Sequence, residues 1–165
     1  MRILKEHIPE IKKIWKAKFG STYDEGLRFL IDSEKVASKD LDTLLVQIES
    51  GKPLQQIIGK WSFYNGEYFL NSNVLIPRPE TELIIEKIRA SQSNLKRILD
   101  LGTGSGCIAI ELSKIFPQAE VLGIDKSVSA LATAKKNNYQ TKNKVKFFQS
   151  DWFASVNGKF DLIVS

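Results

Sequence analysis

Three glycines occupy every second position near the middle of the chain, at Gly102, Gly104 and Gly106 in the segment DLGTGSG. Glycine has no Cβ atom, so such a segment can turn sharply and let a ligand approach its backbone closely. An apolar run typical of a strand precedes it and a run typical of a helix follows it. The backbone N–H groups of the loop would therefore lie at a helix N-terminus. The pattern predicts a binding loop for a small ligand, with a purely structural turn as the alternative.

A carboxylate follows this loop at a distance that suits a nucleoside. Asp125 comes nineteen residues after Gly106, at the end of the next expected strand, where a carboxylate can accept hydrogen bonds from both ribose hydroxyls. Nicotinamide dinucleotide sites usually have the spacing GxGxxG, because their helix N-terminus faces a pyrophosphate. Here the spacing is GxGxG, and the acidic Asp100 before it is unfavourable for phosphate. A nucleoside cofactor without phosphate, such as S-adenosylmethionine, fits this pattern better.

Strand and helix patterns alternate on both sides of the loop. Short apolar runs predict buried strands, and segments with apolar residues every three or four positions predict helices. Their order predicts the start of a parallel, doubly wound sheet and hence an α/β fold. The expected strands are 97–101, 119–125, 144–151 and 159–165, and the expected helices are 107–116 and 127–140.

The first fifty or so residues have helical patterns only. One helical face gathers the apolar residues Ile8, Ile11, Trp15 and Phe19. The segment 24–32 is expected to form another short helix, and the apolar residues between 41 and 48 a third. These helices predict a small subdomain with a limited core of its own.

Two aromatic-rich runs then flank the pair Asn65-Gly66. This pair favours a type I′ turn and therefore predicts a β-hairpin. Residues 1–75 are predicted to form a helical domain, with the hairpin as a linker at about 60–75. Residues 76–165 are predicted to form the cofactor-binding domain, so the boundary is expected near residues 75–80.

Composition excludes several classes of protein. With 42% hydrophobic and 26% charged residues, the chain is typical of a globular protein, and no apolar run is long enough to span a bilayer. The single Cys107 excludes an intrachain disulfide framework and suits a reducing compartment, so a cytoplasmic location is expected. No Cys/His cluster indicates a metal site. The net charge of +5 has its local source near 142–146, where three lysines form either a patch that contacts RNA or an acidic partner or, more simply, a solvated loop.

Four segments together resemble the release-factor glutamine methyltransferases, the HemK/PrmC family. DLGTGSG resembles motif I of the class I S-adenosylmethionine-dependent methyltransferases, which is widely shared. The segment LIPRPETEL at 75–83 is far more specific, and PLQQIIG at 53–59 and SDWF at 150–153 add to it. The resemblance extends over essentially the whole chain. It implies a Rossmann-like methyltransferase sheet preceded by a helical domain that recognises the substrate.

The resemblance also implies a reaction and its partners. Such enzymes transfer a methyl group from S-adenosylmethionine to the side-chain amide nitrogen of the glutamine in the Gly-Gly-Gln motif of class I peptide release factors. They need no membrane and no direct contact with nucleic acid. Asp125 would hold the ribose, and Asp151 and Trp152 would flank the adenine. The methionine and ribose side would be lined by Gly102, Thr103, Gly104, Ser105 and Gly106.

The end of the chain matters for this interpretation. In the family, the sequence IVS is followed at once by NPPY, whose asparagine and backbone carbonyl accept hydrogen bonds from the target amide. Here IVS ends the sequence at Ser165. The chain is therefore expected to be the front portion of a longer enzyme and to lack methyl transfer activity alone.

Two alternatives remain at this point. Methyltransferases with NPPY-type motifs also modify exocyclic amino groups of adenine in nucleic acids. A non-catalytic fragment that binds the cofactor is the other alternative. Arg78 and Thr81 are expected near the cleft where the two parts of the chain meet, although a rigid linker explains Pro77 and Pro79 equally well.

Overall fold

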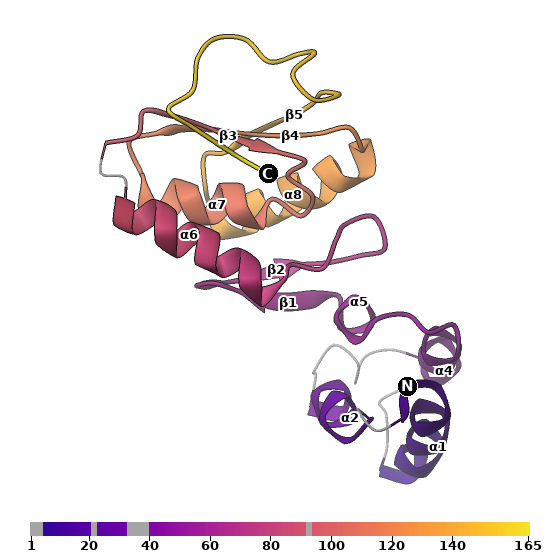
Figure 1. Cartoon of the computed structure of the whole chain (residues 1–165). Helices are drawn as coiled ribbons and strands as arrows, with labels where there is room; N and C mark the ends of the chain where they lie inside the picture. The colour runs from indigo at the N-terminus through magenta and orange to yellow at the C-terminus, as the bar shows by residue number, and fades with distance from the viewer. Residues whose placement is uncertain (1–4, 21–22, 33–39, 92–93) are drawn as a thin grey trace. The chain divides into compact units, whose positions relative to one another are not determined.

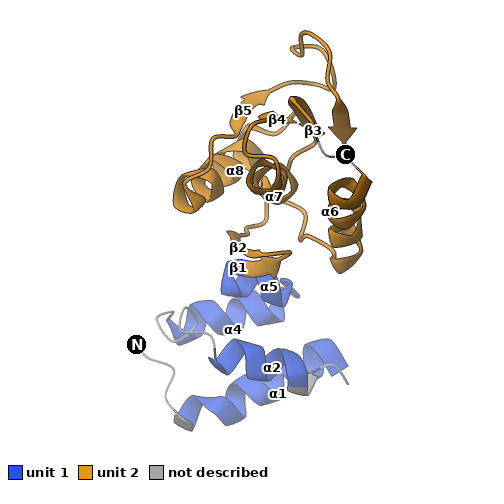
Figure 2. Cartoon of the chain, turned by 90° about the vertical axis from the view of Figure 1, so that its left-hand side faces the viewer, with its two compact units in different colours: residues 1–60 blue, residues 61–165 orange. Residues whose placement is uncertain are grey.

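The computed structural model describes residues 5–20, 23–32, 40–91 and 94–165 (Figure 1). The chain divides into two compact units, residues 1–60 and residues 61–165 (Figure 2). The division lies earlier in the chain than the expected boundary near residues 75–80. The hairpin falls in the second unit because its strand β2 packs against two helices of that unit. The recognition role of the helical part stays a prediction.

The first unit consists of helices packed around one apolar cluster. Its elements are the 3-10 helix η1 (Lys5–His7) and the helices α1 (Ile8–Phe19), α2 (Tyr23–Asp32), α4 (Leu41–Glu49) and α5 (Leu54–Ile58). Asp40 caps α4 by accepting a hydrogen bond from the Thr43 N–H. The buried cluster contains Ile11, Trp15, Leu27, Leu30, Leu44, Ile48 and Ile57. Ile11 and Trp15 come from the expected face of the first helix.

The predicted hairpin is present, but its turn differs from the expected one. Strands β1 (Lys60–Phe63) and β2 (Gly66–Phe69) pair around Tyr64 and Asn65. A type I′ turn at Asn65-Gly66 needs positive φ at both residues. Instead, Tyr64 has a φ of 52°, and neither Asn65 nor Gly66 has positive φ. The type I′ prediction is therefore wrong.

Tertiary contacts explain this turn. The Tyr64 N–H donates to Glu82 Oε1 on helix α6 (Pro79–Ser91) at 3.0 Å, which holds Tyr64 in its unusual conformation. A Cβ atom on Gly66 would lie 2.7 Å from Glu111 Oε1 and 2.8 Å from the Tyr68 ring. Glycine is required there by close packing and not by the turn.

The second unit contains the predicted parallel sheet. Its strands are β3 (Arg97–Leu101), β4 (Glu120–Asp125), β5 (Lys146–Gln149) and β6 (Leu162–Val164), in the spatial order β5-β4-β3-β6 and all parallel. Helices α7 (Cys107–Ile115) and α8 (Val128–Thr141) connect the strands β3, β4 and β5. The chain thus crosses from one side of β3 to the other. Open α/β sheets bind ligands at such a switch point, at the carboxyl ends of the strands.

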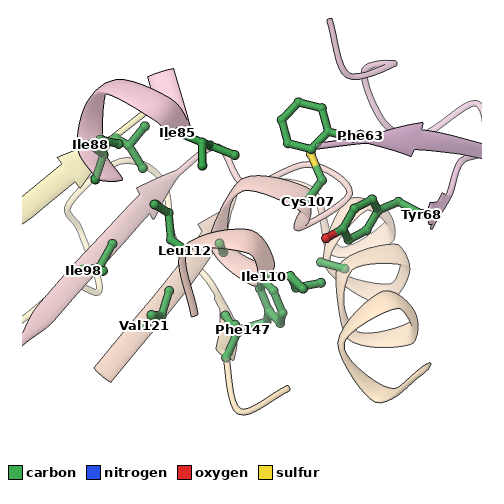
Figure 3. Close-up of a cluster of buried hydrophobic side chains, with 14 of the residues drawn as sticks. Phe63, Tyr68, Ile85, Ile88, Ile98, Cys107, Ile110, Leu112, Val121 and Phe147 are labelled. Atoms are coloured by element: carbon green, nitrogen blue, oxygen red, sulfur yellow. The ribbon is translucent and has the colours of Figure 1, made fainter. Parts of the chain in front are cut away.

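Each face of this sheet has its own apolar layer. Alternate strand residues such as Ile98, Val121 and Phe147 pack toward α7, and the hairpin residues Phe63 and Tyr68 join the same cluster (Figure 3). The residues between them point to the opposite face, where Leu99, Leu122 and Ile124 pack with Val156 and Phe160. Figure 1 shows α6, α7 and α8 on one side of the sheet and the segment after β5 on the other.

No helix in the described parts of the chain is long and apolar enough to cross a membrane.

Candidate functional site

The glycine loop connects the carboxyl end of β3 to the start of α7. Gly102, Gly104 and Gly106 all have positive φ, at 67°, 55° and 79°. Residues with a Cβ atom adopt positive φ only at a cost in free energy, so the backbone conformation explains why these three positions are glycine. At Gly102 an added Cβ would meet no atom within 4 Å, so this side of the loop is open.

Gly106 has a different environment from Gly102. A Cβ atom there would lie 3.0 Å from both Ala134 Cβ and Phe147 Cζ. Gly106 therefore lets α7 approach α8 and β5, and it lines neither of the two pockets described below. Of the five predicted loop residues, Gly102 lines both pockets, and Thr103, Gly104 and Ser105 line one.

The N–H groups of this loop are largely used inside the protein. The Thr103 N–H donates to the Ile124 carbonyl at 2.8 Å, and the Gly106 N–H donates to the Thr103 carbonyl at 2.8 Å. The Gly104 N–H donates to Asp125 Oδ2 at 2.9 Å. A phosphate-binding loop instead directs such donors at its ligand. These internal hydrogen bonds therefore favour a ligand that accepts few hydrogen bonds from the loop and donates hydrogen bonds to the Asp125 carboxylate.

Asp125 lies at the carboxyl end of β4 with both carboxylate oxygens fixed. Its Oδ1 accepts from the Ser127 N–H at 2.8 Å, and its Oδ2 accepts from Gly104. A carboxylate has about four acceptor positions, so about two remain for a ligand. The side chain is half-buried and lines a pocket. The arrangement suits two neighbouring hydroxyl groups.

A second carboxylate, Asp100, lies buried beneath the loop. Its Oδ2 accepts from the Thr103 hydroxyl at 2.5 Å, and only 2% of the residue is exposed. Burial raises the pKa of Asp100 to about 7, although hydrogen bonds from Thr103 and the Ala109 N–H oppose the shift. Asp100 stabilises the loop through its hydrogen bond with the Thr103 hydroxyl, and it lines neither pocket.

Two pockets meet at Gly102 and Ser165, which follow the neighbouring strands β3 and β6. The first has a volume of about 250 Å³ and contains Asp125, Asp151 and Trp152. The second has a volume of about 260 Å³ and contains Arg78 and Thr81 on one side and the glycine loop on the other. Both lie at the switch point of the sheet. Arg78 and Thr81 thus lie beside the expected ligand loop, within the second unit.

Trp152 lies at the rim of the first pocket. It has a φ of 50° and is 69% exposed. Ser150 holds this turn, because its hydroxyl donates to the Trp152 carbonyl at 2.7 Å and accepts from the Ser155 N–H at 3.0 Å. Asp151 is exposed, and its carboxylate lies 3.9 Å from Lys126 Nζ. An exposed indole held by a fixed turn offers a flat apolar surface to an aromatic ring.

The sequence interpretation missed several pocket residues. Ser150 stands in the segment SDWF, and its position beside the predicted Asp151 and Trp152 was its only signal in the sequence. Lys126 directly follows Asp125, yet nothing in its type indicated a pocket. The other missed residues line the pockets through tertiary packing: Leu101, Ile124, Leu75, Ile84, Cys107 and Ile108.

Cys107 lines the second pocket, but its thiol is unreactive. Burial raises the pKa of the Cys107 thiol to about 12, so the thiol stays protonated and is a poor nucleophile. No group of three or more His, Cys, Asp or Glu side chains within the described ranges could hold a metal ion. In the lysine cluster, Lys146 Nζ bonds Glu120 Oε1 at 2.7 Å. At least one of the three lysines is therefore paired with a carboxylate of the protein itself.

Comparisons with known proteins agree with this geometry. The model of the methyltransferase small domain family matches residues 79–165. The release factor glutamine methyltransferase of Buchnera aphidicola subsp. Schizaphis graminum is 41% identical over 137 residues, which cover 82% of this chain and 50% of that protein. The one from Flavobacterium psychrophilum is 45% identical over 132 residues, covering 75% and 46%. The resemblance to release-factor glutamine methyltransferases is thereby confirmed.

The chain spans about half the length of these curated relatives. Among solved structures, the tRNA (uracil-54, C5)-methyltransferase of Pyrococcus abyssi, in complex with S-adenosyl-L-homocysteine, aligns with a TM-score of 0.53. It is 20% identical and covers 63% of this chain and 26% of its own. At that identity the likeness supports the fold alone.

Proposed function

Because the chain belongs to the methyltransferase small domain family, we propose that the two pockets at its glycine loop bind S-adenosylmethionine. Asp125 carries this proposal: its carboxylate is fixed by two backbone N–H groups and has acceptor positions left for two ribose hydroxyls. The adenine would lie against Trp152 in the first pocket. The methionine part would pass Gly102 into the second pocket, because the two pockets share this residue.

The charges of the site support this ligand. S-adenosylmethionine carries a positive sulfonium and no phosphate, and Asp100 and Asp125 lie at or beneath the loop. A phosphate would be repelled by the Asp125 carboxylate. The proposed ligand also needs few donors from the loop, in agreement with the N–H groups already used by the protein.

For the whole protein we propose methyl transfer to the side-chain amide nitrogen of the glutamine in the Gly-Gly-Gln motif of a release factor. The names of relatives at 41% and 45% identity support this substrate. The chain's own residues would bind and orient the methyl donor, while the cofactor supplies an already activated methyl group. Since an amide nitrogen is a weak nucleophile, positioning is the main contribution expected from the protein.

A free, buried thiol at Cys107 supports a cytoplasmic location.

A methylation assay tests this proposal. The whole protein is incubated with S-adenosylmethionine labelled in its methyl group and a purified release factor, with tRNA and duplex DNA as competing acceptors. We expect label in the release factor and none in a release factor whose Gly-Gly-Gln glutamine is replaced by alanine. Label in tRNA or DNA instead would overturn the protein substrate and favour the nucleic-acid alternative.

A further inference from the structure

Asn137 is a buried polar side chain on α8 that lines neither pocket. Only 2% of the residue is exposed, yet its amide is fully engaged. Its Nδ2 donates to the Ser105 carbonyl at 2.9 Å and to the Phe69 carbonyl at 3.2 Å. Its Oδ1 accepts from the Phe69 N–H at 2.8 Å. One amide therefore satisfies three backbone groups from two distant segments.

Both segments lead to residues that line the second pocket. Ser105 belongs to the glycine loop and lines this pocket directly. Phe69 ends strand β2, and the chain continues from it to the wall formed by Leu75, Pro77 and Arg78. A second contact holds the same stretch, because Asn71 Nδ2 donates to the Thr133 hydroxyl at 2.8 Å. Thr133 lies one helical turn before Asn137, so α8 holds the stretch at two successive turns.

We propose that Asn137 is a positioning residue for cofactor binding: it fixes the glycine loop and the hairpin exit to α8, so that the second pocket keeps its shape. The consequence for the cofactor rests on the proposed function, whereas the effect on the loop does not. Only an amide side chain of this length supplies the two donors and one acceptor that the three backbone groups require.

The neighbouring Asn138 provides a matched control. It lies on the same helix and also bonds a backbone carbonyl, since its Nδ2 donates to the Val145 carbonyl at 3.0 Å. Val145 precedes β5 and lines neither pocket. If asparagines of α8 that bond backbone carbonyls only stabilise the fold, the two positions will respond alike. If Asn137 positions the loop, only its substitution will affect the loop selectively.

The experiment compares Asn137→Asp with Asn138→Asp in the full chain. Aspartate has nearly the shape of asparagine, but its carboxylate cannot donate to the Ser105 carbonyl. Amide hydrogen exchange is measured at Gly104 and Gly106 and, as a reference for general loss of stability, at residues of β3 and β4. The affinity for S-adenosylhomocysteine is measured by calorimetry. Asn137→Ser replaces the first variant if that variant does not fold.

For Asn137→Asp we expect loop exchange to accelerate about tenfold beyond the strand reference, and the affinity to fall about tenfold, as for loss of the one buried hydrogen bond that joins Asn137 to the loop. Asn138→Asp is expected to change neither quantity beyond its effect on overall stability. Equal behaviour of the two variants, or an unchanged loop in Asn137→Asp, would overturn the inference. If the wild-type chain binds no S-adenosylhomocysteine, the proposed function fails, and loop exchange alone decides the role of Asn137.

Discussion

Substitution of Asp125 by asparagine separates cofactor binding from folding. Asparagine keeps the shape of the side chain, removes the charge and turns one acceptor oxygen into a donor nitrogen. In the wild type, Oδ1 and Oδ2 each accept a backbone N–H, from Ser127 and Gly104. The remaining acceptor positions face the first pocket, where we place the ribose hydroxyls.

The expected loss follows from these bonds. Two charge-assisted hydrogen bonds to the ribose, each contributing about 1.5 kcal/mol, give a loss of about 3 kcal/mol. This corresponds to a roughly 150-fold increase in Kd for S-adenosylhomocysteine. The unfolding free energy should fall by only about 1–2 kcal/mol, because the asparagine oxygen still accepts one of the two backbone N–H groups.

Asp161 is the matched control. Its Oδ2 accepts from the N–H groups of Lys96 and Arg97 at 2.8 and 2.9 Å, at the amino end of β3. Both aspartates thus accept two backbone N–H groups at opposite ends of the sheet, but Asp161 lines neither pocket. Calorimetric titration and urea unfolding of Asp125→Asn and Asp161→Asn measure affinity and stability side by side. Affinity of Asp125→Asn within threefold of wild type, or an equal loss in Asp161→Asn, would refute the reasoning.

Three further predictions concern the loop and its support. Gly102→Ala and Gly106→Ala both place a Cβ at positive φ, at a cost of about 1–2 kcal/mol each. Gly102→Ala is expected to weaken S-adenosylhomocysteine binding more than Gly106→Ala does. Gly106→Ala is expected to lower the melting temperature more, because of the two glycines only Gly106 faces packed atoms. A larger loss of affinity in Gly106→Ala together with a larger loss of melting temperature in Gly102→Ala would contradict this. Since burial raises the pKa of Asp100 to about 7 from 3.8, the folded state binds an extra proton between these values, and the stability contributed below pH 3.8 is lost as the pH rises to about 7. Relative to Asp100→Asn, the wild type should therefore lose up to about 4 kcal/mol of unfolding free energy over this pH range, as measured by urea unfolding. Parallel pH profiles of the two proteins would show that the pKa of Asp100 is not raised in the folded state. Tyr68→Phe removes the hydroxyl that donates to the buried carboxylate of Glu111 and should destabilise the chain by about 1–3 kcal/mol; an unchanged melting temperature would show that this bond contributes nothing.

The sequence predicted those parts of the site that depend on local pattern and spacing. The strand before the glycine loop, the helix after it and Asp125 at the next strand end all follow from periodicity and from the geometry of a parallel sheet. Positive φ at Gly102 and Gly104 agrees with the reason given for the glycines.

What the sequence did not predict depends on contacts between distant segments. The hairpin turn differs because Tyr64 bonds to Glu82 and Gly66 packs beside Glu111. Asn137 shows no local signal, since its partners lie at positions 69 and 105. Its hydrogen bonds become apparent only once α8, β2 and the loop are placed together.

The binding of S-adenosylhomocysteine to the isotope-labelled chain, followed by NMR, tests the central claim most directly. We predict saturable shifts at the amides of Gly102, Gly104 and Asp125 and at the indole of Trp152, all of which belong to or border the two pockets. No shifts at any concentration, or shifts confined to the lysine segment at 142–146, would contradict the assignment of these pockets as the cofactor site.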